Sequence, residues 1–85
     1  MAKVVMYCTA VCPYCINAER LLKNRGVTEI EKIRIDLDDE QRVIMESRSK
    51  RRTVPQIFID DRHIGGFDDM AELDREGGLL PLLNN

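Results

Sequence analysis

The sequence predicts a small α/β domain in which helices flank a four-stranded mixed sheet, in the order β-α-β-α-β-β-α. Short apolar segments alternate with helical segments over the first half of the chain, which indicates a parallel crossover. Two short strands then follow each other across a tight turn, which indicates an antiparallel hairpin. The length of 85 residues is enough for one domain, spanning residues 1–85.

The first strand is expected at residues 3–7 and the first helix at residues 13–25. The segment K-V-V-M-Y is β-branched and mostly apolar, which is typical of a strand. Pro13 suits the first helical position, where its missing N–H would have no partner, and Gly26 favours an end to the helix. The residues that recur at helical spacing are Tyr14, Ala18, Leu21, Leu22 and Arg25.

A second strand is expected at residues 30–36, where apolar and charged residues alternate around Arg34. A second helix is expected at residues 39–49. Its spacing predicts that Val43, Ile44 and Ser47 face inward.

The hairpin is expected from Q-I-F-I at 56–59 and R-H-I at 62–64, joined by a turn at 60–61. A last helix is expected from Asp68 to Glu76, because two glycines follow it. The closing L-L-P-L-L segment is expected to cover the remaining core surface.

Composition argues against several classes of protein. The net charge is −2, so no strong field favours nucleic acid. No apolar run approaches the roughly 20 residues that cross a bilayer, and the N-terminus turns polar too soon for a signal peptide. We therefore expect a cytoplasmic protein without membrane contacts, whose thiols stay reduced and serve catalysis or metal binding.

All three cysteines lie in C-T-A-V-C-P-Y-C at residues 8–15. Cys12 falls at the expected start of the first helix, where free backbone N–H groups and the helix dipole favour a thiolate. Such a position can lower a cysteine pKa to roughly 3.5–7.5. Cys15 lies one turn further on the same face, from which it can close a disulfide ring. The pair thus predicts an exposed attacking thiol and a more buried resolving thiol.

Other interpretations of the cysteines are weaker. A zinc site needs about four ligands, which Cys8, Cys12, Cys15 and His63 supply only by count, without a second C-x-x-C. The C-x3-C-x2-C spacing also matches radical enzymes that cleave S-adenosylmethionine, but 85 residues cannot build their barrel. Cys8 is expected to be a partly buried thiol at a strand end, with a regulatory disulfide as the alternative.

Two further segments complete a candidate site. Pro55 in T-V-P either starts a strand or forms a cis peptide that turns the Val54 backbone outward, where an extended peptide can pair with it. In G-G-F-D-D at residues 65–69, the glycines permit close approach of a ligand. Asp68 and Asp69 either cap the last helix or bind a ligand ammonium group.

C-P-Y-C at 12–15, T-V-P at 53–55 and G-G-F-D-D at 65–69 together resemble a dithiol glutaredoxin over nearly the whole chain. The resemblance implies a thioredoxin-like fold and glutathione as co-substrate, with no permanently bound cofactor or metal. It implies that Cys12 is the nucleophile, Cys15 the resolving thiol and Pro55 cis. The remaining residues that it assigns to the glutathione groove are Tyr14, Thr53, Val54, Gly66, Phe67 and Asp68.

The basic segment before T-V-P adds a candidate contact. Arg51 and Arg52 are the nearest cations for the glycyl carboxylate of glutathione. Many glutaredoxins carry a lysine three residues before the nucleophile, whereas this chain has Thr9. The substitution removes one cation from beside both the thiolate and the ligand, and the two arginines are the residues that can compensate.

The sequence therefore predicts a monomeric, glutathione-dependent thiol–disulfide oxidoreductase acting on protein disulfides and glutathionylated proteins. One alternative is a glutaredoxin-like redoxin that thioredoxin reductase reduces. Another is an iron–sulfur carrier that holds a cluster with glutathione between two subunits. Pro13 argues against the carrier, because cluster-carrying family members usually have a smaller residue at that position.

Overall fold

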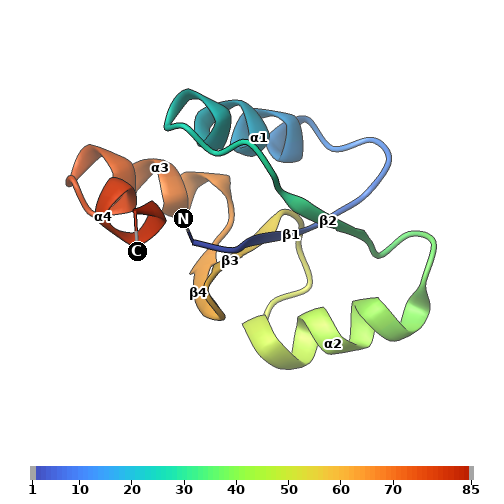
Figure 1. Ribbon diagram of the computed structural model, residues 1–85. Coiled ribbons are helices and arrows are strands. Elements are labelled where there is room, and N and C mark those ends of the chain that lie inside the picture. Colours follow the sequence, from blue (N-terminus) through green and yellow to red (C-terminus); the bar gives the residue numbers. More distant parts are fainter. Residues whose placement is uncertain (1, 85) are drawn as a thin grey trace.

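The computed structural model describes residues 2–84, which form a mixed four-stranded sheet with helices on both faces (Figure 1). The strand order is β2-β1-β3-β4; β1 and β2 are parallel, and the other neighbouring pairs are antiparallel. The predicted fold class is confirmed. The elements are β1 (Val4–Cys8), α1 (Pro13–Asn24), β2 (Glu31–Arg34), α2 (Asp39–Ser49), β3 (Gln56–Ile59), β4 (Arg62–Gly65), α3 (Phe67–Arg75) and α4 (Leu79–Leu83).

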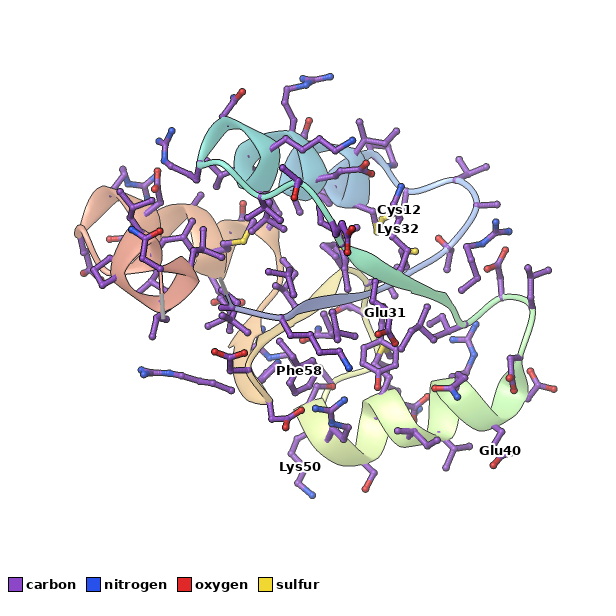
Figure 2. The ribbon with its side chains drawn as sticks, in the orientation of Figure 1. Cys12, Glu31, Lys32, Glu40, Lys50 and Phe58 are labelled. Atoms are coloured by element: carbon purple, nitrogen blue, oxygen red, sulfur yellow. A yellow bond between two sulfur atoms is a disulfide. The ribbon has the colours of Figure 1, made fainter. Side chains whose placement is uncertain are left out.

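The central strand β1 is buried on both faces and separates two apolar clusters. Alternate side chains of a strand point to opposite faces. Val4, Met6 and Cys8 join the cluster formed with residues of α1, α3 and α4. Val5 and Tyr7 join the smaller cluster on the side of α2. Figure 2 shows Phe58 on this second side, whereas Cys12 lies at the start of α1.

The helix α2 presents a different face to the sheet from the one that the sequence predicts. Met45 is fully buried and Ser49 nearly so, whereas the predicted Val43 and Ser47 are exposed. Met45 and Ser49 are four residues apart and share one face, while Val43 lies about 200° around the helix from Met45. The prediction for Val43 and Ser47 was wrong, because charged residues on all sides of this helix left its apolar face poorly defined; Ile44 is half-buried.

Element ends differ slightly from the predictions. β2 is limited to four residues, and α3 begins at Phe67, one residue earlier than expected. The closing L-L-P-L-L segment forms the short helix α4, in which Leu79 and Leu83 are buried. Within residues 2–84, no helix is both long enough and apolar enough to cross a membrane.

An ion pair joins the C-terminal ends of α1 and α3. Arg25, the C-cap residue of α1, donates two hydrogen bonds of 2.8 and 2.7 Å from its guanidinium to the carboxylate of Asp74 near the end of α3. This bidentate geometry fixes the orientation of the two side chains as well as the distance between them. Both helices begin at the opposite end, where the candidate site lies.

Candidate active site

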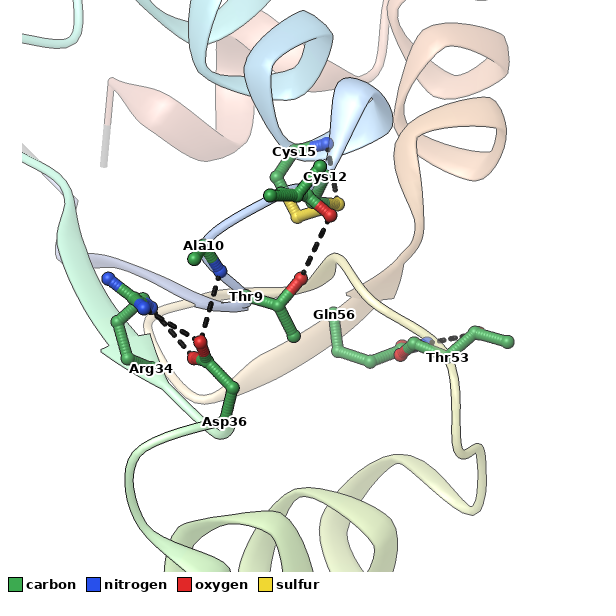
Figure 3. The surroundings of a disulfide bond; sticks show 9 residues. Thr9, Ala10, Cys12, Cys15, Arg34, Asp36, Thr53 and Gln56 are labelled. Atoms are coloured by element: carbon green, nitrogen blue, oxygen red, sulfur yellow. Dashed lines mark hydrogen bonds and ion pairs between the residues drawn. A yellow bond between two sulfur atoms is a disulfide. The ribbon is translucent and has the colours of Figure 1, made fainter.

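A disulfide between Cys12 and Cys15 lies at the start of α1, with the two Cα atoms 5.2 Å apart (Figure 3). Cys12 is the N-cap residue, and its Sγ accepts a hydrogen bond from the backbone N–H of Cys15 at 3.1 Å. Pro13 occupies the first turn. The predicted N-cap position of Cys12 is thus confirmed. In the reduced protein, the same N–H and the positive end of the helix would stabilise a thiolate on Cys12.

The two cysteines are almost equally buried in the disulfide form. Cys12 is 7% exposed and Cys15 is 5% exposed, so the expected contrast between an exposed and a buried thiol is absent. The disulfide ring folds both side chains over the first turn of the helix, which explains the similarity. The exposed side chains around it are apolar: Val11, Tyr14 and Ile16.

The loop before Cys12 is tied to the end of β2 by Asp36. Its carboxylate accepts the Ala10 N–H at 3.3 Å and two hydrogen bonds of 2.7 Å from Arg34 (Figure 3). The Arg34 guanidinium holds the pKa of Asp36 at about 2, below its ordinary 3.8. The sequence did not predict this role of Asp36, because its partner Ala10 lies 26 residues away.

A groove of about 300 Å³ lies beside the start of α1. It unites all the residues that the sequence predicts for ligand binding, apart from Arg52, and it includes Asp69 beside Asp68. Arg52 does not line it, because this exposed side chain points to Glu46 of α2 at 3.7 Å. The groove residues are Tyr14, Arg51, Thr53, Val54, Pro55, Gly66, Phe67, Asp68 and Asp69.

Asp69, rather than Asp68, caps α3. The Asp69 carboxylate accepts the Gly66 N–H at 2.9 Å and a hydrogen bond from Arg51 Nη1 at 2.6 Å. These contacts, that of Arg51 first, lower the pKa of Asp69. The capping alternative is therefore confirmed for Asp69 and not for Asp68, because the helix begins at Phe67 and the residue at its third position reaches back to the N-cap. Asp68 is exposed and forms no ion pair within residues 2–84.

The Val54–Pro55 peptide is cis, as the sequence predicts. Among residues 2–84, neither the N–H nor the C=O of Val54 has a backbone hydrogen-bond partner. This edge of the groove therefore offers one free donor and one free acceptor. Thr53, immediately before it, accepts a hydrogen bond from the side chain of the buried Gln56 (Figure 3).

Cys8 is a free thiol with 4% exposure, in a second pocket of about 220 Å³ that Cys12 and Cys15 also line. Burial raises the pKa of Cys8, which favours its protonated form. His63, the fourth residue of the zinc alternative, bonds instead to Gln56 at 2.7 Å. Within the part of the chain that the structure describes, no three His, Cys, Asp or Glu side chains form a group suited to a metal ion.

Comparison with known proteins places this geometry in a family. The glutaredoxin family model matches residues 4–64. The chain is 51% identical over 83 residues to Glutaredoxin 3 of Escherichia coli, covering 98% of this chain and 99% of that one. It is 49% identical over 84 residues to a glutaredoxin of Neisseria meningitidis, covering 99% of each.

Solved structures resemble the fold as well. The crystal structure of a buckwheat glutaredoxin–glutathione complex superposes with a TM-score of 0.88 at 30% identity, covering 98% of this chain and 77% of that one. The solution structure of a glutaredoxin from Brucella melitensis gives a TM-score of 0.84 at 43% identity, covering 98% and 89%.

Proposed function

Because the chain belongs to the glutaredoxin family and is a thiol–disulfide oxidoreductase, we propose that it draws its electrons from glutathione. One observation carries the proposal. The groove beside the Cys12–Cys15 disulfide offers hydrogen-bonding and charged groups of the kinds that this tripeptide needs. The similar buckwheat glutaredoxin forms a complex with glutathione, which supports the same ligand here.

Glutathione carries two carboxylates and one ammonium group, and its cysteine lies between them. Arg51 supplies a cation for the glycyl carboxylate, while remaining within reach of Asp69. The start of α3, at Gly66 and Phe67, supplies the positive end of a helix for the γ-glutamyl carboxylate. Asp68, exposed and free of ion pairs within residues 2–84, supplies an anion for the ammonium group.

The free N–H and C=O of Val54 suit the backbone of the glutathione cysteine, which would lie against this edge like an added strand. Tyr14 is exposed and also lines the groove. A ligand held this way directs its sulfur toward Cys12.

The proposed reaction begins with the reduced enzyme. The Cys12 thiolate attacks one sulfur of a protein disulfide, forms a mixed disulfide and releases the other sulfur as a thiolate, which takes up a proton. Cys15 then attacks the Cys12 sulfur, which releases the reduced substrate and forms the Cys12–Cys15 disulfide. Two molecules of glutathione reduce this disulfide in two exchanges and leave as glutathione disulfide.

Glutathionylated proteins follow a shorter route. Cys12 attacks the sulfur of the bound glutathione, and the protein thiol is the leaving group. A second glutathione thiolate attacks the glutathione sulfur of the Cys12–glutathione disulfide, which forms glutathione disulfide and releases the Cys12 thiolate. Cys15 takes no part, so this route needs one enzyme thiol.

The test compares two sources of electrons for one mixed-disulfide substrate. The first is glutathione with glutathione reductase and NADPH; the second is thioredoxin reductase with NADPH. We expect turnover with glutathione, its loss in Cys12→Ser, and its retention in Cys15→Ser toward a glutathionylated peptide. Turnover with thioredoxin reductase but not with glutathione would refute glutathione dependence. A Cys15→Ser variant without activity toward the glutathionylated peptide would refute the assigned thiol roles.

A further inference from the structure

A buried amide under the groove carries the next inference. Gln56, at the start of β3, is fully buried, yet its side chain has partners at both ends. Its Nε2 donates to the backbone oxygen of Thr53 at 3.1 Å and lies 3.3 Å from the Thr53 hydroxyl. Its Oε1 lies 2.7 Å from Nε2 of His63 on β4. The chain His63–Gln56–Thr53 therefore runs from the hairpin to the groove.

The chemistry of the partners fixes the direction of this chain. The Thr53 carbonyl oxygen can only accept a hydrogen bond, so the Gln56 NH2 group must face it. The Gln56 oxygen consequently faces His63, and His63 Nε2 must carry a hydrogen. His63 thus donates to Gln56, and Gln56 donates to Thr53. A buried group that loses its partner on either side is left unsatisfied, at a substantial cost in free energy.

His63 is itself held in place. Its ring packs on Phe58 of β3, with the centroids 5.0 Å apart, and Phe58 is its register partner across the hairpin. Burial first, and the charge of Arg51 second, lower the pKa of His63, which favours the neutral ring. Protonation would occur at Nδ1 and leave the Nε2–H donor in place.

We propose that His63 and Gln56 are positioning residues, which hold Thr53 against the groove and so set its affinity for glutathione. This inference rests on the proposed function, because Thr53 lines the groove that is assigned to glutathione. Neither residue lines that groove, so each acts only through Thr53. The cis peptide and the free Val54 edge follow directly after Thr53, so its position also sets theirs.

The main variant is His63→Phe, which keeps a ring on Phe58 and removes the N–H that Gln56 Oε1 accepts. We expect the KM for glutathione to rise roughly 2- to 12-fold, the range that matches the net loss of one hydrogen bond, with kcat little changed. His63→Gln carries an amide N–H at a similar reach and should restore most of the affinity. Gln56→Glu removes the hydrogen bond between residue 56 and the Thr53 oxygen, because a carboxylate cannot donate. This variant should raise the KM for glutathione as well.

Leu79→Val is the control for a general loss of stability. Leu79 is fully buried in α4 and does not line the groove, so this variant should melt at a lower temperature with an unchanged KM. The second readout is the amide spectrum of ¹⁵N-labelled protein without ligand. The Thr53 and Val54 signals should shift in His63→Phe and return toward wild-type positions in His63→Gln.

The outcomes separate this inference from the proposed function. If the wild-type protein does not use glutathione, the proposed function fails, and the Thr53 and Val54 shifts alone decide whether His63 positions this segment. If glutathione is used but His63→Phe has a wild-type KM, or if His63→Gln restores nothing, the positioning role is refuted. Unmoved Thr53 and Val54 signals in His63→Phe refute it in either case.

Discussion

Replacing Gly65 with alanine tests how the groove is assembled. Gly65 has φ +116°, a conformation that L-residues rarely adopt. An added Cβ would lie 2.4 Å from Oδ2 and 2.8 Å from Cγ of Asp69. The Asp69 side chain would have to leave its place, and with it the hydrogen bonds to the Gly66 N–H and to Arg51.

The expected loss has two parts. A side chain in a sparsely populated backbone region costs about 1–3 kcal/mol. Loss of the capping contact at the start of α3 costs about 0.5–2 kcal/mol. We therefore expect Gly65→Ala to lower the free energy of unfolding by roughly 1.5–5 kcal/mol.

Gly26→Ala is the matched control, measured like Gly65→Ala by urea denaturation. Gly26 also has positive φ, +94°, but an added Cβ there meets nothing within 4 Å. Only the cost of the backbone conformation should appear in Gly26→Ala. This variant should therefore destabilise the protein less than Gly65→Ala, by about the contribution of the capping contact. In the glutathione assay, Gly65→Ala should also raise KM, because Arg51 loses the partner that orients it, whereas Gly26→Ala should not.

A double variant sharpens the comparison. Asp69→Ala removes two of the three closest contacts of the added Cβ. Gly65→Ala and Asp69→Ala together should therefore destabilise the protein by less than the sum of the two single variants. Equal losses for Gly65→Ala and Gly26→Ala, or strict additivity with Asp69→Ala, would refute the reasoning.

Three further predictions concern single groups. In the reduced protein at pH 6, iodoacetamide should modify Cys12 faster than Cys8, because the helix start favours the thiolate of the first and burial raises the pKa of the second; mass spectrometry of the digested protein gives both rates. Asp36→Asn should be less stable than the wild type at pH 7. Since Arg34 lowers the Asp36 pKa to about 2, the difference should persist above pH 3.8 and shrink as the pH falls toward 2, in urea titrations at each pH. Asp68→Ala should raise the KM for glutathione with little change in melting temperature, because this carboxylate caps no helix; a large fall in melting temperature with a constant KM would contradict this.

The sequence predicted the fold because its signals are local. Apolar strands, Pro13 at a helix start and the hairpin turn each specify structure within a few residues. The groove residues were also found, since T-V-P and G-G-F-D-D carry the resemblance to a family whose motifs meet in space. The fold brings these two segments together on one side of the disulfide.

What the sequence did not predict depends on contacts between distant segments. Asp36 reaches Ala10 from 26 residues away, and Arg51 reaches Asp69 across 18 residues. The inward face of α2 follows from packing against β1 and β3, because its own pattern is weak. Arg52 was assigned to the groove by its nearness in sequence to Arg51, yet its side chain reaches Glu46 of α2 instead.

The ion pair between Arg25 and Asp74 has a consequence for substrate choice. It fastens α1 to α3 at the ends remote from the active site, so the two helices cannot swing apart there without breaking two hydrogen bonds. Over residues 2–84, the groove end of the two helices carries no such tie, and there the segment at 51–55 and the Tyr14 ring, both on the groove lining, are the parts that a change of substrate would meet first.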